Sequence, residues 1–432
     1  WMMFLIIYYI WVINNIIYFI KEDNIMKKKY ELLKNDTIDV NGHTLYRIKA
    51  LKSFSDVKEG DLGGYIEKED NLRHYGNCWV YNDAKVYEDA IVYSNAKIFD
   101  NAEIYGSAVI IDSAKIFDNA KIHGHARIHD KVKIFDNVEI YYNAKIFNKV
   151  EIYDNSNIYG DALIFNNVKI FDNVKVCGNA NISNYVVLCN DAKITGDAHV
   201  FGNSRVYDKA IICGNVRIFD YAEVYGNAMV FGNAQIFGNA KVYDKARIYN
   251  DAWVYDYAKV YNNAKVFDKS TVSGNAKIFN NTKIGGSSVV KDDAMIFGNA
   301  KVCDKALVGG DAKVGDCANI LDDAIVFNHS RIFKYTNIRK CTDYILLPIE
   351  VNDNPDPLDD KRIVGIKYLT VYVSFEDDKS SIQKIYVSIG SFTYDIDEFM
   401  ENIDNILPNI INRAEMEDTM THVAEVLIGI HS

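Results

Sequence analysis

The sequence predicts an all-β fold, a solenoid in which short parallel strands wind into stacked coils. The first observation is a six-residue repeat that runs from Cys78 to Thr342 without an insertion. The second observation is the set of residue types at each position of the repeat. Every sixth residue from Val80 to Ile338 is Ile or Val, apart from Leu188, and the residue four positions later is usually Ala. An α-helix would carry that aliphatic residue around all of its faces, so the period favours a short strand followed by a corner.

The repeat from Ala96 to Asn101 illustrates how the six positions are used. Ile98 is expected to point inward and its two neighbours outward, by the two-residue alternation of a strand. Asp100 and Asn101 are expected to form the corner, because Asp, Asn and Gly tolerate left-handed backbone or hydrogen-bond to their own main chain. Three such sides close a coil of about eighteen residues, and about fifteen coils at about 4.8 Å spacing give a rod of roughly 70 Å.

Residues eighteen apart should lie above one another on one face of such a solenoid. The column that starts at Tyr81 is almost unbroken aromatic, whereas the columns that start at Tyr87 and Tyr93 are patchier. We call the first column the aromatic ladder and expect it to be the best candidate for an interaction face. Its members are Tyr81, Phe99, Phe117, Phe135, Tyr153, Phe171, Tyr207, Tyr225, Tyr243, Tyr261, Phe279 and Phe297. Two interpretations stay open: the rings stabilise neighbouring strands, or they form an apolar stripe that binds another copy, another protein or a glycan.

The repeat resembles that of hexapeptide-repeat proteins of the left-handed β-helix type, which carry an aliphatic residue and then a small residue four positions later. The left-handed winding is implied by this resemblance alone. Residues 28 to 81 also resemble a group of uncharacterised bacterial and phage proteins, through Leu45 to Leu51, Asp61 to Glu67 and Asn71-Leu72. Members of that group are classed variously as transferases or as polymer-forming cytoskeletal proteins. In the enzymes of the superfamily the second repeat position is generally small or acidic, whereas here it is mostly aromatic.

The formal charge of −11 is concentrated toward the C-terminus. Residues 343 to 432 hold 18 acidic and 6 basic residues, a net of −12, which leaves about +1 for the rest of the chain (42 basic against 41 acidic). A neutral repeat region without a basic stripe does not suit nucleic acid. The seven cysteines are scattered and show no metal-ligand spacing, so we expect reduced thiols and a cytoplasmic protein.

Residues 1 to 25 form an apolar segment with two interpretations. The segment is rich in Ile, Tyr and Asn and directly precedes Met26, which favours upstream translation; the alternative is a single-pass membrane anchor or signal segment. Residues 26 to 76 are expected to form a small β cap, because an open solenoid end exposes unpaired strand edges. The repeat itself is assigned to residues 77 to 342.

Residues 343 to 432 are expected to form an acidic α/β domain that caps the far end. The segments 363 to 375 and 382 to 389 alternate like a pair of strands. Asp395 can cap a short helix, and residues 409 to 428 are predicted to form a second, amphipathic helix.

No cluster in the repeat stands out as catalytic. The weak candidates are His123, His125 and His129; the first and last occupy outward aromatic positions on different faces, and His125 lies at a corner. In left-handed β-helix acyltransferases a histidine acts as general base in a cleft between subunits, a role that the resemblance would imply for one of these residues. Because the repeat has no loop to shape such a cleft, surface substitution is the favoured interpretation. We expect no cofactor and no metal.

These observations favour a non-catalytic structural or scaffolding rod that acts through self-association or protein binding along the aromatic ladder. Two alternatives stay open. The resemblance implies a trimeric acyl- or acetyltransferase that binds acyl-CoA between subunits, and the aromatic stripe could instead mark a carbohydrate-binding module. Membrane contact is expected only if residues 1 to 25 are an anchor.

Overall fold

The computed structural model describes residues 28–334, 336–340, 344–352, 364–375, 382–389, 392–407 and 413–431. The apolar segment 1–25 lies outside these residues. By its internal contacts the chain divides into two units, residues 1–214 and 215–432. Each unit is built on the predicted parallel β-solenoid, with about 15 coils in all.

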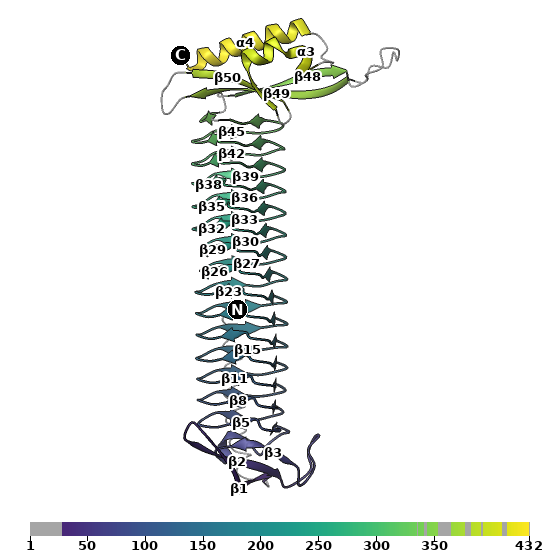
Figure 1. Ribbon diagram of the computed structural model, residues 1–432, viewed down its shortest axis with the longest axis vertical. Coiled ribbons are helices and arrows are strands. Elements are labelled where there is room, and N and C mark those ends of the chain that lie inside the picture. Colours follow the sequence, from purple (N-terminus) through teal and green to yellow (C-terminus); the bar gives the residue numbers. More distant parts are fainter. Residues whose placement is uncertain are drawn as a thin grey trace, which may run out of the picture. The chain divides into compact units, whose positions relative to one another are not determined.

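In the first unit, each coil has three short strands, one on each of three faces (Figure 1). Strands eighteen residues apart pair in parallel and in register, as Lys97 does with Lys115. The first face consists of β4 (Trp79–Val80), β7 (Lys97–Ile98), β10 (Lys115–Ile116), β13 (Lys133–Ile134), β16 (Glu151–Ile152), β19 (Lys169–Ile170), β22 (Val187–Leu188) and β25 (Arg205–Val206). The second face consists of β5 (Lys85–Val86), β8 (Glu103–Ile104), β11 (Lys121–Ile122), β14 (Glu139–Ile140), β17 (Asn157–Ile158), β20 (Lys175–Val176), β23 (Lys193–Ile194) and β26 (Ile211–Gly214). The third face consists of β6 (Ile91–Val92), β9 (Val109–Ile110), β12 (Arg127–Ile128), β15 (Lys145–Phe147), β18 (Leu163–Phe165), β21 (Asn181–Ser183) and β24 (His199–Val200).

The second unit repeats this plan, and its faces are numbered by the same step of eighteen residues. Its first face consists of β28 (Glu223–Val224), β31 (Lys241–Val242), β34 (Lys259–Val260), β37 (Lys277–Ile278), β40 (Met295–Ile296), β43 (Lys313–Val314) and β46 (Arg331–Ile332). Its second face consists of β29 (Met229–Gly232), β32 (Arg247–Ile248), β35 (Lys265–Val266), β38 (Lys283–Ile284), β41 (Lys301–Val302), β44 (Asn319–Ile320) and β47 (Asn337–Ile338). Its third face consists of β27 (Arg217–Ile218), β30 (Gln235–Ile236), β33 (Trp253–Val254), β36 (Thr271–Val272), β39 (Val289–Val290), β42 (Leu307–Val308) and β45 (Ile325–Val326).

The core of each coil is filled by the aliphatic residue of each strand and by the small residue that follows the corner. On the first face, Ile134, Ile152 and Ile170 pair in register and are fully buried. Burial of each such side chain contributes roughly 1.5–3 kcal/mol. Main-chain bonds join the coils as well: the amides of Lys97 and Phe99 donate to carbonyls of the next coil at 2.9 and 2.8 Å. The predicted inward position of the aliphatic residue is confirmed.

The corners explain the abundance of Asp and Asn in the repeat. Asp136 and Asp154 have φ of 61° and 59°, in the left-handed region that these residue types tolerate. The carboxylate of Asp136 accepts the amide N–H of Asp154 at 3.2 Å, so the corner side chain also ties one coil to the next. At the following position, the Asn155 side-chain amide donates to the Asn173 side chain at 3.2 Å. The corner residues therefore form polar columns parallel to the aliphatic core.

At the start of the first unit, β1 (Tyr30–Val40), β2 (His43–Ala50) and β3 (Leu62–Ile66) form an antiparallel sheet. β3 then pairs in parallel with β5, so it covers the edge of that solenoid strand. A 3₁₀ turn, η1 (Glu69–Asn71), follows, and the buried Asn71 amide donates to the carbonyls of Glu88 and Ala90 at 3.0 and 2.9 Å. These contacts satisfy polar groups that an open end would expose.

The C-terminal part of the second unit is a four-stranded antiparallel sheet of β48 (Tyr344–Asn352), β49 (Val364–Phe375), β50 (Ile382–Ile389) and β51 (Phe392–Asp395). The predicted pair of strands is confirmed as β49 and β50. β48 was not predicted; it contains Pro348, and its partner β49 lies beyond the acidic segment that follows it. The helices are α2 (Ile396–Glu401), α3 (Ile403–Ile406) and α4 (Arg413–His431), and the Asp395 side chain caps α2 as expected.

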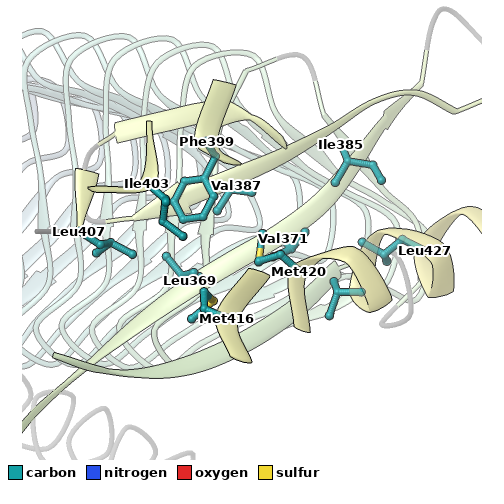
Figure 2. Packing of buried hydrophobic residues seen from close by; sticks show 11 residues of the cluster. Leu369, Val371, Ile385, Val387, Phe399, Ile403, Leu407, Met416, Met420 and Leu427 are labelled. Carbon is teal, nitrogen blue, oxygen red and sulfur yellow. The ribbon is translucent and has the colours of Figure 1, made fainter. Parts of the chain in front are cut away.

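Figure 2 shows the core of this C-terminal part, where apolar side chains from the sheet and helices meet. Phe399 and Ile403 from α2 and α3, and Met420 and Leu427 from α4, pack with Val371 of β49 and are buried. α4 lies over the sheet (Figure 1).

The same sheet also covers strand edges at the last coils of the second unit. The amide N–H of Phe333 donates to the Tyr372 hydroxyl at 3.1 Å, and the amide of Arg331 donates to the Thr370 hydroxyl at 2.6 Å. Tyr372 is fully buried, and the Tyr344 hydroxyl accepts the amide of Phe327 at 3.2 Å. Side-chain hydroxyls thus replace the carbonyls that another coil would supply.

The buried Ile column sets the stability of the solenoid. We expect Ile152→Ala to lower the free energy of unfolding by about 2–5 kcal/mol, because it leaves a cavity between Ile134 and Ile170. The matched control is Glu151→Ala on the same strand, which removes only partly exposed ion pairs and should cost less than about 1 kcal/mol. Urea unfolding followed by circular dichroism compares the two; equal losses would contradict the assignment of the core.

Candidate interaction faces

The aromatic ladder exists as predicted in the first unit. Tyr81 stacks on Phe99 at a ring-centroid distance of 4.4 Å, and Phe99 on Phe117 at 4.8 Å. Further along, Tyr153 stacks on Phe135 and on Phe171 at 4.8 and 5.1 Å, with ring planes within 4° of parallel. Within these runs each ring therefore covers the face of the next.

The ladder of the second unit has the same geometry. Tyr243 stacks on Tyr225 and on Tyr261, each at 4.9 Å and nearly parallel. Phe279 stacks on Tyr261 at 5.1 Å and on Phe297 at 5.4 Å.

Stacking decides what a ladder ring can offer to a ligand. An interior ring such as Tyr243 has both of its faces covered by neighbouring rings, so only its edge and hydroxyl are accessible. The ladder rings are partly buried, and none is among the exposed large apolar side chains of the described residues. A ladder of this kind presents ring edges to a partner rather than flat platforms.

The first ladder ring is held by a charged contact with the N-terminal cap. The Tyr81 hydroxyl donates to Asp56 at 3.0 Å, and the same carboxylate forms an ion pair with Lys97. The hydrogen bond from Lys97 lowers the pKa of Asp56 to about 2, and burial raises the pKa of Tyr81. Lys97 also lies over the Tyr81 ring, 5.6 Å from its centroid.

Basic side chains run beside the ladder on the first face of the second unit. Lys241 pairs with Glu223 at 3.1 Å, and Lys259 and Lys277 follow in register with it. Because lysine stems flank the ring edges, this face suits a partner with acidic groups.

A recess interrupts the ladder where Gly315 takes the place of a ring. The side chains of Phe297 and Phe333 close toward this glycine, with ring centroids 5.9 Å apart and tilted by 55°. The recess beside Gly315 has a volume of about 320 Å³. It is lined by Phe279, Met295, Phe297, Lys313, Asp316, Phe333, Lys334 and Thr393. It is a mainly apolar hollow with the basic Lys313 and Lys334 and the acidic Asp316 in its lining.

The three histidine candidates do not converge. His123 lies between Tyr105 and Tyr141 in a ring stack on the second face, and its Nε2 is 3.3 Å from Glu139. His125 is exposed at a corner. His129 was expected at the surface, but it is buried on the third face at 9% exposure, stacked on Phe147.

His129 belongs to a cluster that the sequence analysis did not identify. Its Nδ1 is 2.9 Å from a carboxylate oxygen of Asp130, and the Asp130 amide donates to Asp112 at 3.3 Å. One ligand atom from each of these residues lies within 4.8 Å of the others, so the trio could hold a metal ion through three ligands. The contact with His129 lowers the pKa of Asp130, whereas burial raises the pKa of Asp112. The hydrogen bond between the His129 ring and Asp130 already accounts for this contact without a metal ion.

The third face of the second unit differs chemically from the other two, and the sequence analysis missed it. Its outward strand residues, one per coil, carry no charge over six successive strands. They are Gln235, Trp253, Thr271, Val289, Leu307 and Ile325. Trp253 and Ile325 are each 45% exposed, and Tyr257 at the adjoining corner is 60% exposed. We call this surface the uncharged face.

Comparison with protein-family models and with curated proteins finds no match for this chain. No helix among the described residues is long and apolar enough to cross a membrane. None of the described cysteines forms a disulfide.

The tyrosines of the ladder should make stability fall at alkaline pH. Burial raises the pKa of Tyr243 from its ordinary value of 10.0 to about 12, and the pKa of Tyr261 is raised for the same reason. The folded chain thus keeps phenolic protons that the unfolded chain releases, so stability is full below pH 10 and is lost as the pH rises toward 12.

The double variant Tyr243→Phe and Tyr261→Phe should lose less stability over this pH window, because Phe has no proton to release. Phe already occupies the same column at Phe279, so the variant should fold like the natural chain at pH 7. Urea unfolding at pH 7, 10 and 11 measures the effect. An unchanged alkaline slope would contradict the burial of these hydroxyls.

Proposed function

We propose that this chain is a non-catalytic scaffolding protein, a β-solenoid of the left-handed hexapeptide-repeat class that acts through self-association or protein binding. The observation that carries the proposal is the uninterrupted register. Throughout the described coil pairs each strand is offset by eighteen residues from its partner, as in Ile134 to Ile152 or Val290 to Val308. The described coils therefore have no inserted loop that would wall off a catalytic cleft.

The aromatic ladder supports a role in protein binding. Ring edges, tyrosine hydroxyls and flanking lysines form a regular strip on the first face of the second unit. Such a strip can meet an extended partner at many equivalent points, which gives affinity by repetition rather than by one deep pocket. Tyr243, Lys259 and Tyr261 are typical of the groups that would contact an acidic partner.

The same geometry gives less support to the carbohydrate alternative. Sugars bind to aromatic residues mainly through exposed ring faces, and interior ladder rings have both faces covered. Trp253 offers an exposed ring to a sugar, whereas Trp79 is buried at 1% exposure and offers none.

The proposal is tested by the mass and shape of the full chain in solution, from light scattering and negative-stain microscopy. We expect laterally associated particles whose mass rises with concentration. A discrete trimer that binds coenzyme A would contradict the proposal and support the acyltransferase alternative.

The role of the ladder is tested with Tyr243→Thr and Tyr261→Thr together, because Thr195 shows that a coil tolerates Thr at this repeat position. The double variant should weaken binding of an acidic partner protein by about tenfold or more, since it removes two adjacent ring edges. The matched control is Tyr249→Thr, which removes a stacked ring from the second face. Equal binding by both variants would show that the ladder is structural.

A further inference from the structure

The uncharged face differs from the other two faces at one repeat position. This is the outward residue that precedes the buried aliphatic residue on each strand, and on the first and second faces of the second unit it is usually basic. On the first face the position holds Glu223, Lys241, Lys259, Lys277, Met295, Lys313 and Arg331. On the second face it holds Met229, Arg247, Lys265, Lys283, Lys301, Asn319 and Asn337. The absence of charge over six strands of the third face is therefore specific to that face and not a property of the repeat.

The neighbouring column of the same face is also nearly free of charge. Phe237 and Tyr255 stack at 4.7 Å, and Trp253 meets Phe237 edge-on at 6.4 Å. The charged member, Lys291, places its amine over the Phe327 ring at 5.1 Å. Along the strands the surface is thus a flat mixture of aromatic, aliphatic and small polar groups.

Charged groups return at the corners that border this face. Asp256, Asp292, Asp293 and Asp311 lie at the corners that follow its strands. An uncharged centre with a charged margin is the usual composition of a protein–protein interface. Trp253 and Ile325, on strands β33 and β45 of this face, are each 45% exposed and would lose water to a partner that covers the face.

We propose that the uncharged face is a homotypic interface, which pairs with the same face of a second copy of this chain. This inference rests on the scaffolding function proposed above and names its partner and surface. In a two-fold symmetric pair the same patch serves both copies, and in an antiparallel pair, with the two-fold axis across the face, each column meets its own kind. The first or second face would then bring lysines against lysines at its centre. The strand columns of the uncharged face meet their copy without like charges, and its acidic corners lie only at the margin, where water and salt screen them.

The size of the face indicates how strong the pairing should be. Six strands at about 4.8 Å span about 29 Å, and a coil side is about 15 Å wide, so a pair would bury about 900 Å² in total. This area lies below that of specific, stable interfaces and is typical of weak, transient pairing. We therefore expect reversible pairing that depends on protein concentration, in which copies of the chain exchange pairing partners.

The test substitutes Val289→Lys and Leu307→Lys together in the full chain. Lys is the commonest residue at this repeat position on the other faces, so the double variant should keep the fold, which thermal unfolding verifies. The matched control is Met229→Lys, which adds the same side chain at the same repeat position on the second face. Sedimentation velocity over a concentration series measures pairing of each protein.

We expect the natural chain and Met229→Lys to pair, and the double variant to pair at least about tenfold more weakly, because two lysines of each copy lose water against an uncharged surface. Pairing should not weaken when salt is raised, since no attraction between opposite charges drives it. Undiminished pairing of the double variant would overturn the inference.

Two further outcomes separate the inference from the proposed function. If Tyr243→Thr with Tyr261→Thr abolishes self-association while Val289→Lys with Leu307→Lys does not, the inference is wrong and the scaffold assembles through the aromatic ladder. If the natural chain stays monomeric at all concentrations but binds an acidic partner, the inference is also wrong, while the proposed protein-binding function stands.

Discussion

The register of eighteen residues between coils is the constraint on which the rest of the structure depends. It is set by main-chain hydrogen bonds, such as that from Phe99 to Ile116, and by the in-register burial of Ile and Val. Because the register does not drift, each position of the repeat lies directly above its equivalent. Core residues, corner side chains, rings and lysines therefore form separate columns, and the chemistry of a surface is a property of a column rather than of a single residue.

The period of the sequence is enough to predict the fold, the inward Ile and Val, the Asp and Asn corners and the stacked ladder. Prediction from the sequence fails where the six-residue repeat ends or where several coils act together. β48 has no repeat to identify it and depends on a distant partner, β49. The burial of His129 depends on Phe147 and on corner groups of two coils, Asp112 and Asp130, which a single repeat does not reveal.

The uncharged face could have been predicted, because its signal is present in the sequence. The step of eighteen residues identified the aromatic ladder when it was applied to the residue after the buried position. Applied to the residue before it, the same step separates Trp253, Thr271 and Val289 from the lysine columns. The exposure of these side chains could not be predicted from the sequence. A half-buried stacked ring and the exposed Trp253 are both aromatic residues of the same repeat, and only the structure distinguishes them.

Charge and stacking together favour different partners for the two faces of the second unit. The ladder combines covered rings with lysines, so its attraction is greatest for a surface of opposite charge and least for its own copy. The uncharged face gains nothing from an acidic partner but can bury Trp253 and Ile325 against a copy of itself. A solenoid with both surfaces can pair with itself through one face and keep the other available, which is the requirement that a scaffold has to meet.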